Sequence, residues 1–162
     1  MNVLIIGGGG REHALAWAVS KSPLLSSLWV THDNPAFYDM GARKCSVEDA
    51  LRKSIELVIV GPEAPLAEGV SNQLREQGIL VFGPSQQAAQ LEASKSFAKD
   101  FMKRHSIPTA DYGVFTDLGS AREYITGPCV VKADGLAAGK GVMVCSSKEE
   151  AIQAVEECFA GR

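Results

Sequence analysis

The chain has 162 residues, of which 46% are hydrophobic, and it carries a formal net charge of -3. This composition is typical of one or two folded domains, and the negative charge argues against a nucleic-acid-binding surface. No apolar run reaches the roughly 20 residues that cross a bilayer, and the first residues, "MNVLIIGGGG", lack the basic segment of a signal peptide. The cysteines form no C-x-x-C pair, which predicts reduced thiols in a cytoplasmic protein. They are Cys45, Cys129, Cys145 and Cys158.

The first part of the chain alternates apolar strands with helical segments. Strands are predicted at 2–6, 27–31, 56–61 and 79–83. Between them the sequence predicts a helix ending near Pro23, a short helix opened by the capping-box pattern at 46–49, and a helix at 66–77. This alternation predicts a parallel sheet with crossover helices, in a Rossmann-like domain spanning residues 1–92.

The pattern changes in residues 93–162. An amphipathic helix is predicted at 94–108 and a strand at 110–115, and capping-box patterns at 120–123 and 147–150 open two more helices. Strands at 128–134 and 141–145 flank one glycine loop, which predicts an antiparallel hairpin in an α+β unit. A hairpin with two helices buries little apolar surface, so we expect this unit to be incomplete at its C-terminus.

The hairpin loop reads "KADGLAAGKG", residues 132–141, and resembles a phosphate-binding loop at first sight. It is not a P-loop: Gly135 and Gly139 are one residue too close, and Gly141 stands where the metal-binding hydroxyl is required. The glycines still allow backbone N–H groups to approach phosphate oxygens, and Lys140 adds a positive charge. The alternative is a solvated hairpin tip.

A second glycine run, "GGGGREH", lies at a strand-to-helix turn, where α/β sheets bind ligands. Gly7 and Gly9 fit the dinucleotide fingerprint G-x-G-x-x-G, but Glu12 replaces its third glycine and would repel a pyrophosphate. Asp33, after the second strand, keeps an NAD site open as an alternative. Arg11 and Glu12 suit a small zwitterionic or phosphorylated ligand, with Arg11 for an anion and Glu12 for an amine or hydroxyl. Both could equally be ordinary residues of a first helical turn.

Two further turns follow predicted strands. In "GPEAPL", residues 61–66, two prolines flank Glu63, whose carboxylate suits an amine or ribose hydroxyls, a plain turn being the alternative. In "FGPS", residues 82–85, Ser85 is expected to cap the next helix.

Taken in order, "GGGGREHALAW", "VGPEAPL", "FGPSQQAAQLEASKSFAKDFMKRHSIPTA" and "VVKADGLAAGKGV" resemble the glycinamide ribonucleotide synthetases (phosphoribosylamine–glycine ligases) along nearly the whole chain. The resemblance implies an α/β fold, with a Rossmann-like pre-ATP-grasp domain followed by the lid subdomain of an ATP-grasp domain. It implies ATP-dependent ligation of glycine to 5-phosphoribosylamine through a glycyl phosphate, with ATP and Mg²⁺ (or Mn²⁺) as cofactors. The stretch "HDNPAFYD", residues 32–39, departs from the family's glycine-rich turn and leaves ribose contacts there open.

The resemblance also implies site residues. Those expected at ATP are Lys95, Lys132, Asp134, Gly135, Gly139, Lys140 and Gly141. Those expected at the substrates are Gly9, Gly10, Arg11, Glu12, Glu63, Pro65 and Ser85. No metal ligand is expected before Arg162, so residues 1–162 alone are expected to be inactive. The expected state is a cytoplasmic monomer, or a dimer, without nucleic-acid or membrane partners. The alternatives are another ATP-grasp enzyme of purine synthesis, an NAD-binding module and a non-catalytic interaction fragment.

Overall fold

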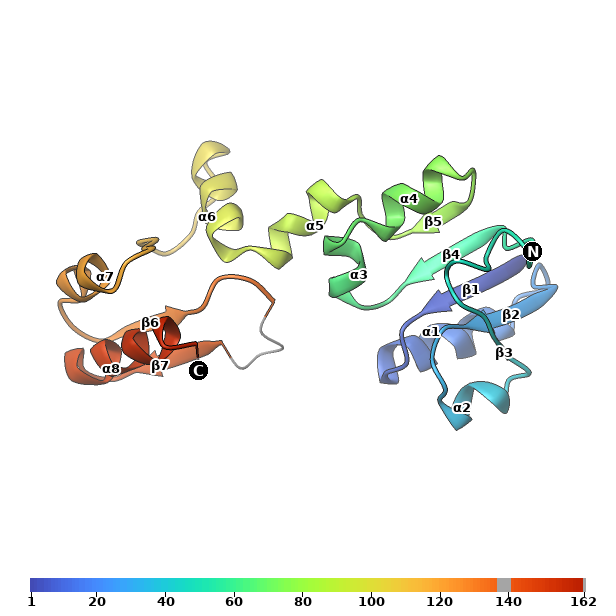
Figure 1. Cartoon of the computed structure of the whole chain (residues 1–162), viewed down its shortest axis with the longest axis horizontal. Helices are drawn as coiled ribbons and strands as arrows, with labels where there is room; N and C mark the ends of the chain where they lie inside the picture. The colour runs from blue at the N-terminus through green and yellow to red at the C-terminus, as the bar shows by residue number, and fades with distance from the viewer. Residues whose placement is uncertain (137–140, 162) are drawn as a thin grey trace. The chain divides into compact units, whose positions relative to one another are not determined.

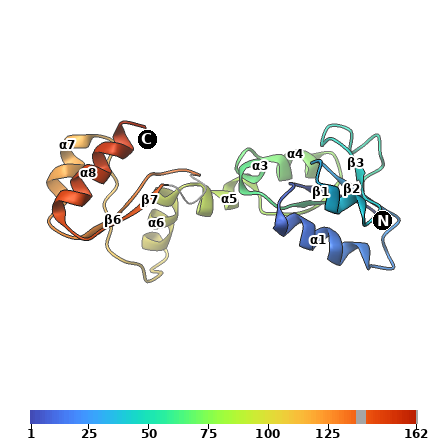
Figure 2. The ribbon, with the colours of Figure 1, turned by 90° about the horizontal axis from the view of Figure 1, so that it is seen from below.

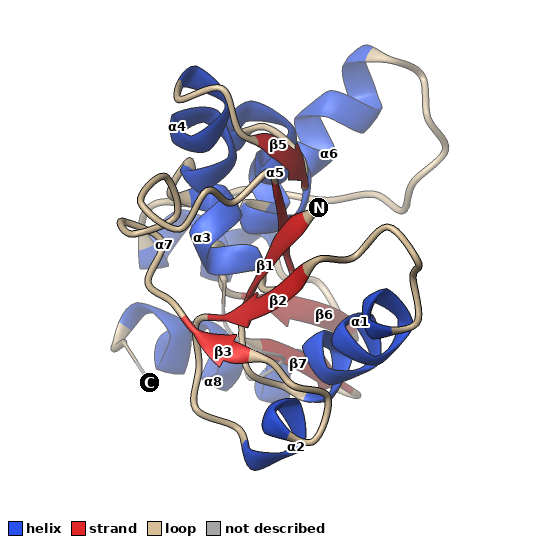
Figure 3. Ribbon diagram, turned by 90° about the vertical axis from the view of Figure 1, so that its right-hand side faces the viewer, coloured by secondary structure: helices blue, strands red, loops and turns tan. Residues whose placement is uncertain are grey.

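The computed structural model describes residues 1–136 and 141–161. These residues form two units, Met1–Gln90 and Leu91–Arg162, each with its own elements and core. The first unit contains a five-stranded parallel sheet in the order β3-β2-β1-β4-β5 (Figure 1; Figure 3). Its strands are β1 (Asn2–Ile6), β2 (Ser27–Val30), β3 (Arg43–Lys44), β4 (Leu57–Val60) and β5 (Leu80–Phe82). The predicted parallel α/β sheet is therefore confirmed.

Helices cover both faces of this sheet because neighbouring residues of its strands point to opposite sides. In β1, Ile5 packs in one core with Ala16 of α1 (Gly10–Ser20) and Phe37 of α2 (Pro35–Tyr38). Leu4 packs in the other core with Leu66 of α3 (Glu63–Ala67) and Leu74 of α4 (Val70–Glu76). Figure 2 shows α1 and the pair α3 and α4 on opposite sides of the strands.

The strand order creates a switch point between β1 and β4. From β1 the chain builds outward to β2 and β3, and it then returns to β4 on the other side of β1. Open α/β sheets bind ligands at such a point, outside the carboxyl ends of the strands. The segments that follow β1 and β4 here are the "GGGGREH" turn and "GPEAPL".

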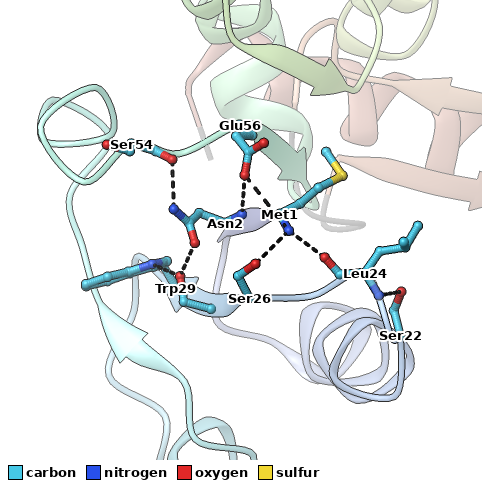
Figure 4. A network of polar contacts seen from close by, with 9 residues as sticks. Met1, Asn2, Ser22, Leu24, Ser26, Trp29, Ser54 and Glu56 are labelled. Carbon is cyan, nitrogen blue, oxygen red and sulfur yellow. Dashed lines mark hydrogen bonds and ion pairs between the residues drawn. The ribbon is translucent and has the colours of Figure 1, made fainter.

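At the opposite edge, the amino ends of the strands are tied together by polar contacts (Figure 4). The backbone N–H of Asn2 donates to Glu56 Oε2 (2.8 Å), and Asn2 Nδ2 donates to the Ser54 carbonyl (3.0 Å). Ser27 Oγ donates to Asn2 Oδ1 (2.7 Å) and accepts from Trp29 Nε1 (2.8 Å). These bonds hold β1 against β2 and against the residues before β4. They thereby help to keep β1 and β4 in register, the two strands whose carboxyl ends lead into "GGGGREH" and "GPEAPL".

The second unit is built on an antiparallel hairpin, as predicted. Strands β6 (Cys129–Lys132) and β7 (Val142–Cys145) pair in register, and α7 (Leu118–Tyr124) and α8 (Lys148–Phe159) share a core with one face of the hairpin. Helix α6 (Lys95–Arg104) also belongs to this unit. Helix α5 (Gln86–Ala93) runs across the boundary between the units, and its Ala89 packs in a core of the first unit. The hairpin's second face is apolar but uncovered within the second unit: Val144 is 79% exposed and Val130 is 49% exposed.

Several local predictions were wrong. Residues 110–115 form no strand, and within the described part of this unit only β6 and β7 pair. Ser46 accepts the N–H of Asp49, but turns rather than a helix follow. The helix predicted at 66–77 is divided into α3 and α4 at Gly69, whose φ of +93° only glycine adopts readily.

Two helix boundaries also differ from the sequence pattern. The helix predicted at 94–108 ends at Arg104, and Ser106 has a φ of +54°. Helix α7 starts before the pattern at 120–123, because the side chain of Asp117 caps it. The short elements α2 and β3 were not predicted.

Candidate functional site

Glu12 lies at the centre of the turn between β1 and α1. Its side chain is buried, with the residue 5% exposed, and its Oε2 accepts the backbone N–H of Gly9 (2.8 Å). This bond satisfies one of the N–H groups left without a partner at a helix start. The carboxylate thus caps α1 from beneath instead of projecting into solvent.

The glycines around Glu12 leave the room that its side chain occupies. A Cβ on Gly61, directly after β4, would lie 2.2 Å from Glu12 Oε1. A Cβ on Gly7 would lie 2.7 Å from Glu12 Cγ, and Gly7 also has a φ of +113°. Both positions therefore require glycine, and Glu12 joins the ends of β1 and β4 by close packing.

Arg11 extends this link across the switch point. Its Nε donates to Glu12 Oε1 (3.0 Å) and its Nη1 donates to Glu63 Oε1 at the start of α3 (2.9 Å). The hydrogen bonds that Arg11 donates to Glu63 and then to Glu12 raise the pKa of Arg11, and the bond that Glu63 accepts from Arg11 lowers the pKa of Glu63. The three side chains, which the sequence predicted at one ligand site, do meet. Together they carry one net negative charge, so an anion would have to compete with two carboxylates for Arg11.

The loop after β2 completes the turn, and sequence reasoning missed its contribution. Thr31 Oγ1 accepts the N–H of Gly7 (3.0 Å), and Asn34 Nδ2 donates to the carbonyl of Gly8 (3.0 Å). A Cβ on Gly8 would lie 2.6 Å from His32 Cβ. The signal was available in principle, because the carboxyl ends of adjacent parallel strands lie at one edge of a sheet.

Asp33, the residue that kept an NAD site open, is engaged elsewhere. Its carboxylate forms an ion pair with Lys44 and accepts from the Tyr38 hydroxyl (2.6 Å). The bond from Lys44, followed by that from Tyr38, lowers the pKa of Asp33. A dinucleotide would normally bind at the glycine turn and at an acidic residue after the second strand. Here Glu12 fills the space beside Gly7, and Asp33 is bound by Lys44 and Tyr38, so contacts within the chain occupy both positions.

The remaining residues predicted at the substrates have simple local positions. Gly9 and Gly10 are exposed at the start of α1, and Pro65 lies within α3. Ser85 Oγ accepts the N–H of Ala88 (3.2 Å), and so makes the contact of a cap at the start of α5.

In the second unit, Asp134 connects the end of β6 to the start of α6. Its Oδ1 accepts the N–H of Lys95 (2.6 Å) and of Gly135 (2.9 Å), and its Oδ2 accepts from the Ser96 hydroxyl. Burial opposes ionisation of this carboxyl, but the bonds from Ser96, Gly135 and Lys95 outweigh it and lower its pKa to about 2. Asp134 therefore stays ionised as the anchor of a helix N-terminus.

Lys95 lies in the same network, although about forty residues separate it from the loop. Its Nζ donates to the carbonyl of Gly135 (2.7 Å). Lys132 is exposed at the end of β6, one residue before the N–H of Ala133 donates to the Gly141 carbonyl (2.8 Å). The structure thus brings Lys95, Asp134 and Gly135 together, whereas the predicted Gly139 and Lys140 lie outside the described residues.

The apolar surface of the hairpin that includes Lys132 was not predicted. Val130, Val142 and Val144 are exposed on the hairpin. Strand alternation places them on the face opposite the helix-covered core, together with Lys132. The signal was the two-residue alternation in "CVVK" and "VMVC". An exposed apolar face that also carries Lys132 suits a nucleobase with its phosphates.

Within residues 1–136 and 141–161, no group of three or more His, Cys, Asp or Glu is arranged to hold a metal ion. No helix in this described part is long and apolar enough to span a bilayer.

Both units match profiles of one protein family. Residues 1–92 match "Phosphoribosylglycinamide synthetase, N domain", and residues 93–162 match "Phosphoribosylglycinamide synthetase, ATP-grasp (A) domain". The phosphoribosylamine–glycine ligase of Mesorhizobium japonicum is 50% identical over 99% of this chain, and that of Chlorobaculum tepidum is 49% identical over 100%. The chain spans 40% and 42% of the length of these two relatives.

Solved structures give the same grouping. The crystal structure of a phosphoribosylamine–glycine ligase from Thermotoga maritima superposes with a TM-score of 0.76 at 35% identity, covering 94% of this chain and 38% of that one. The biotin carboxylase domain of the 2-oxoglutarate carboxylase from Hydrogenobacter thermophilus has a TM-score of 0.76 at 20% identity, covering 98% of this chain and 40% of that one. The second match indicates a shared fold only.

Proposed function

The chain belongs to the phosphoribosylglycinamide synthetase family, and from this we propose that it takes part in the ATP-dependent ligation of glycine to 5-phosphoribosylamine. In this reaction the glycine carboxylate attacks the γ-phosphate of ATP, and the resulting glycyl phosphate is attacked by the amine of phosphoribosylamine. The products are glycinamide ribonucleotide, ADP and phosphate. Phosphoryl transfer of this kind depends mainly on positioning and on cations that balance the developing charge.

We assign residues 1–92 to the binding of phosphoribosylamine and glycine. The observation that carries this assignment is the Arg11–Glu63 ion pair of 2.9 Å, which joins the two turns at the switch point. Gly9, Gly10, Pro65 and Ser85 stay in the proposed site as residues of the same turns and of the next helix cap. Because the Arg11–Glu12–Glu63 cluster has a net negative charge, the half-buried carboxylate of Glu63 suits the amine and hydroxyl groups of these substrates better than the phosphate.

Residues 93–162 are proposed to contribute to the ATP site as a connecting helix and a lid subdomain. Lys95 and Lys132 supply positive charge for the phosphates, and the valine face of the hairpin suits the adenine ring. Asp134 and Gly135 hold the start of α6 and Lys95 in place. Gly139, Lys140 and Gly141 complete the proposed phosphate loop by sequence. Bound ATP would supply the phosphoryl group, with Mg²⁺ (or Mn²⁺) as its counterion.

The proposal is tested in a complete ligase that carries this sequence in place of the matching segment of the Mesorhizobium relative. ADP formation is measured while ATP, glycine and phosphoribosylamine are varied one at a time. Lys132→Ala should raise the KM for ATP, and Glu63→Ala should raise the KM for phosphoribosylamine or glycine. Tyr112→Phe, at an aromatic residue away from the proposed contacts, serves as the control variant.

Two outcomes would contradict the proposal. One is ADP formation that does not require glycine and phosphoribosylamine together. The other is a pair of variants, Lys132→Ala and Glu63→Ala, that both leave all three substrate dependences at the level of the control. Tight binding of NAD to the unsubstituted chain would instead favour the dinucleotide-binding alternative.

A further inference from the structure

Two of the four cysteines face each other across the β6–β7 hairpin. Cys129 and Cys145 are direct partners in its antiparallel register. Positions 133 and 141 form a hydrogen-bonded pair, since Ala133 N donates to Gly141 O (2.8 Å). Bonded and non-bonded pairs alternate along such a ladder, so Cys129 and Cys145 also occupy a bonded pair, with Cα atoms about 5.5 Å apart. This Cα spacing lies within the range of disulfides, but the Cβ atoms of a bonded pair lie about 5.5 Å apart, wider than the roughly 3.5–4.5 Å of a disulfide. A bond between these residues therefore requires a small shift of the strands and would be readily reduced.

The two side chains lie on the same face of the hairpin, but they differ in access to solvent. Cys145 is buried in the core under α7 and α8, whereas Cys129 is exposed. Cys129 also lines an open groove with Tyr124 and Pro128, which gives small solutes a route to its sulfur. Burial raises the pKa of Cys145, and the adjacent Cys129 raises it further. One thiol is therefore open to a dissolved reagent, and its neighbour is held beneath it.

The other two cysteines lack this arrangement. Cys45 is buried in the first unit, and Cys158 lies on α8. Neither has a cysteine as its strand partner in the described sheets. Among the described cysteines, only the hairpin pair thus combines an accessible thiol with a second thiol at the directly opposite strand position.

We propose that Cys129 and Cys145 form a reversible thiol-oxidation site that reacts with peroxides. The Cys129 thiolate attacks a peroxide oxygen and breaks the O–O bond, which gives a sulfenic acid and, with one proton, water. The Cys145 sulfur then attacks the sulfenic sulfur, and the hydroxyl takes up the proton of the Cys145 thiol and leaves as a second water. Hydrogen peroxide is reduced by two electrons, the two thiols are oxidised to one disulfide, and a dithiol reverses the change.

The disulfide would close the chain between Cys129 and Cys145, a segment that contains Lys132, Asp134 and Gly135. Oxidation would thereby crosslink the base of the hairpin that carries these three residues. Because the proposed oxidation needs only the two thiols and a peroxide, it can be tested without the ligase reaction, and its failure would not affect the proposed ligase function.

The test uses the purified reduced chain and hydrogen peroxide in small molar excess. Remaining thiols are alkylated under denaturing conditions, and the digest is analysed by mass spectrometry. We expect loss of two alkylatable thiols per chain and one crosslinked species that joins the Cys129 and Cys145 peptides. Dithiothreitol should restore both thiols, and treatment in denaturant should distribute the crosslinks among the four cysteines.

Matched variants make the outcome decisive. Cys129→Ser and Cys145→Ala should abolish the crosslink, whereas Cys45→Ser and Cys158→Ser should retain it. Cys129 is exposed, so its variant should keep the native circular dichroism spectrum even if the substitution at buried Cys145 does not. The proposal is overturned if both thiols stay alkylatable while the peroxide oxidises a free cysteine standard. It is equally overturned if Cys129 is oxidised without a link to Cys145, or is linked to Cys158 or to a second chain.

Discussion

Asp134 gives the most direct test of how the second unit holds its predicted ATP residues. Asp134→Asn keeps the size of the side chain but removes the charge that faces the N-terminus of α6. A fall in pKa from 3.8 to about 2 corresponds to about 2 kcal/mol in favour of the folded state. The residue is exposed, so solvent screening reduces this to about 1 kcal/mol. We therefore expect local opening at the start of α6 to increase about fivefold.

The assay is amide hydrogen exchange of residues 94–104 at neutral pH, in the wild type and the variant. Asp117→Asn is the matched control, because Asp117 caps α7 by the same kind of bond and should accelerate exchange only there. The lowered pKa of Asp134 also fixes the sign of the pH dependence. The stabilisation is complete above pH 4 and is lost as the pH falls through about 2. Unchanged exchange in α6, or an ordinary pKa for Asp134 in an NMR titration, would refute this reasoning.

Three further predictions concern the first unit, and thermal or urea unfolding followed by tryptophan fluorescence tests each of them. Gly61→Ala should destabilise the unit by about 1–3 kcal/mol because the new Cβ would overlap Glu12. Gly10→Ala is the control and should have no such effect, since no atom lies within 4 Å of a Cβ at that position. Equal destabilisation by the two variants would refute the packing argument. Glu12→Gln should lower the free energy of unfolding by about 1 kcal/mol because the amide loses the ion pair with Arg11. Unchanged stability would show that burial alone holds this side chain in place. Ser71→Ala should stabilise the unit by up to about 1 kcal/mol, since this fully buried hydroxyl has no partner among the residues described; a clear loss of stability would reveal a partner.

The sequence predicted the architecture well because its signals are local and periodic. Apolar runs separated by helical segments indicated the parallel sheet, and two strands around one glycine loop indicated the hairpin. The failures lie where tertiary context decides the outcome. Residues 110–115 have a strand-like composition but no strand to pair with among those described, and the pattern at 46–49 forms its cap contact without a following helix.

The chemistry of the site was harder to predict than its position. Sequence spacing brought Arg11, Glu12 and Glu63 to one edge of a sheet, and the structure agrees. It did not reveal that Glu12 is buried against Gly61, because the space left by a missing Cβ depends on a loop about fifty residues away. It also did not reveal that Arg11 already has two carboxylate partners. Contacts between distant segments decide which predicted ligand residues remain open to a ligand.

Glu12 and Asp134 illustrate one principle in two separate units. Each carboxylate accepts backbone N–H groups at a helix start and connects that helix to the end of a strand. Each also lies beside a cation that the sequence predicted at a ligand, Arg11 in one case and Lys95 in the other. The two carboxylates therefore set the location of these cations: Arg11 is exposed although it already donates to two carboxylates, and Lys95 is half-buried. On this reasoning, amide variants of the two carboxylates should weaken ligand binding only through the disorder of the neighbouring turn, and stabilising that turn elsewhere should restore binding.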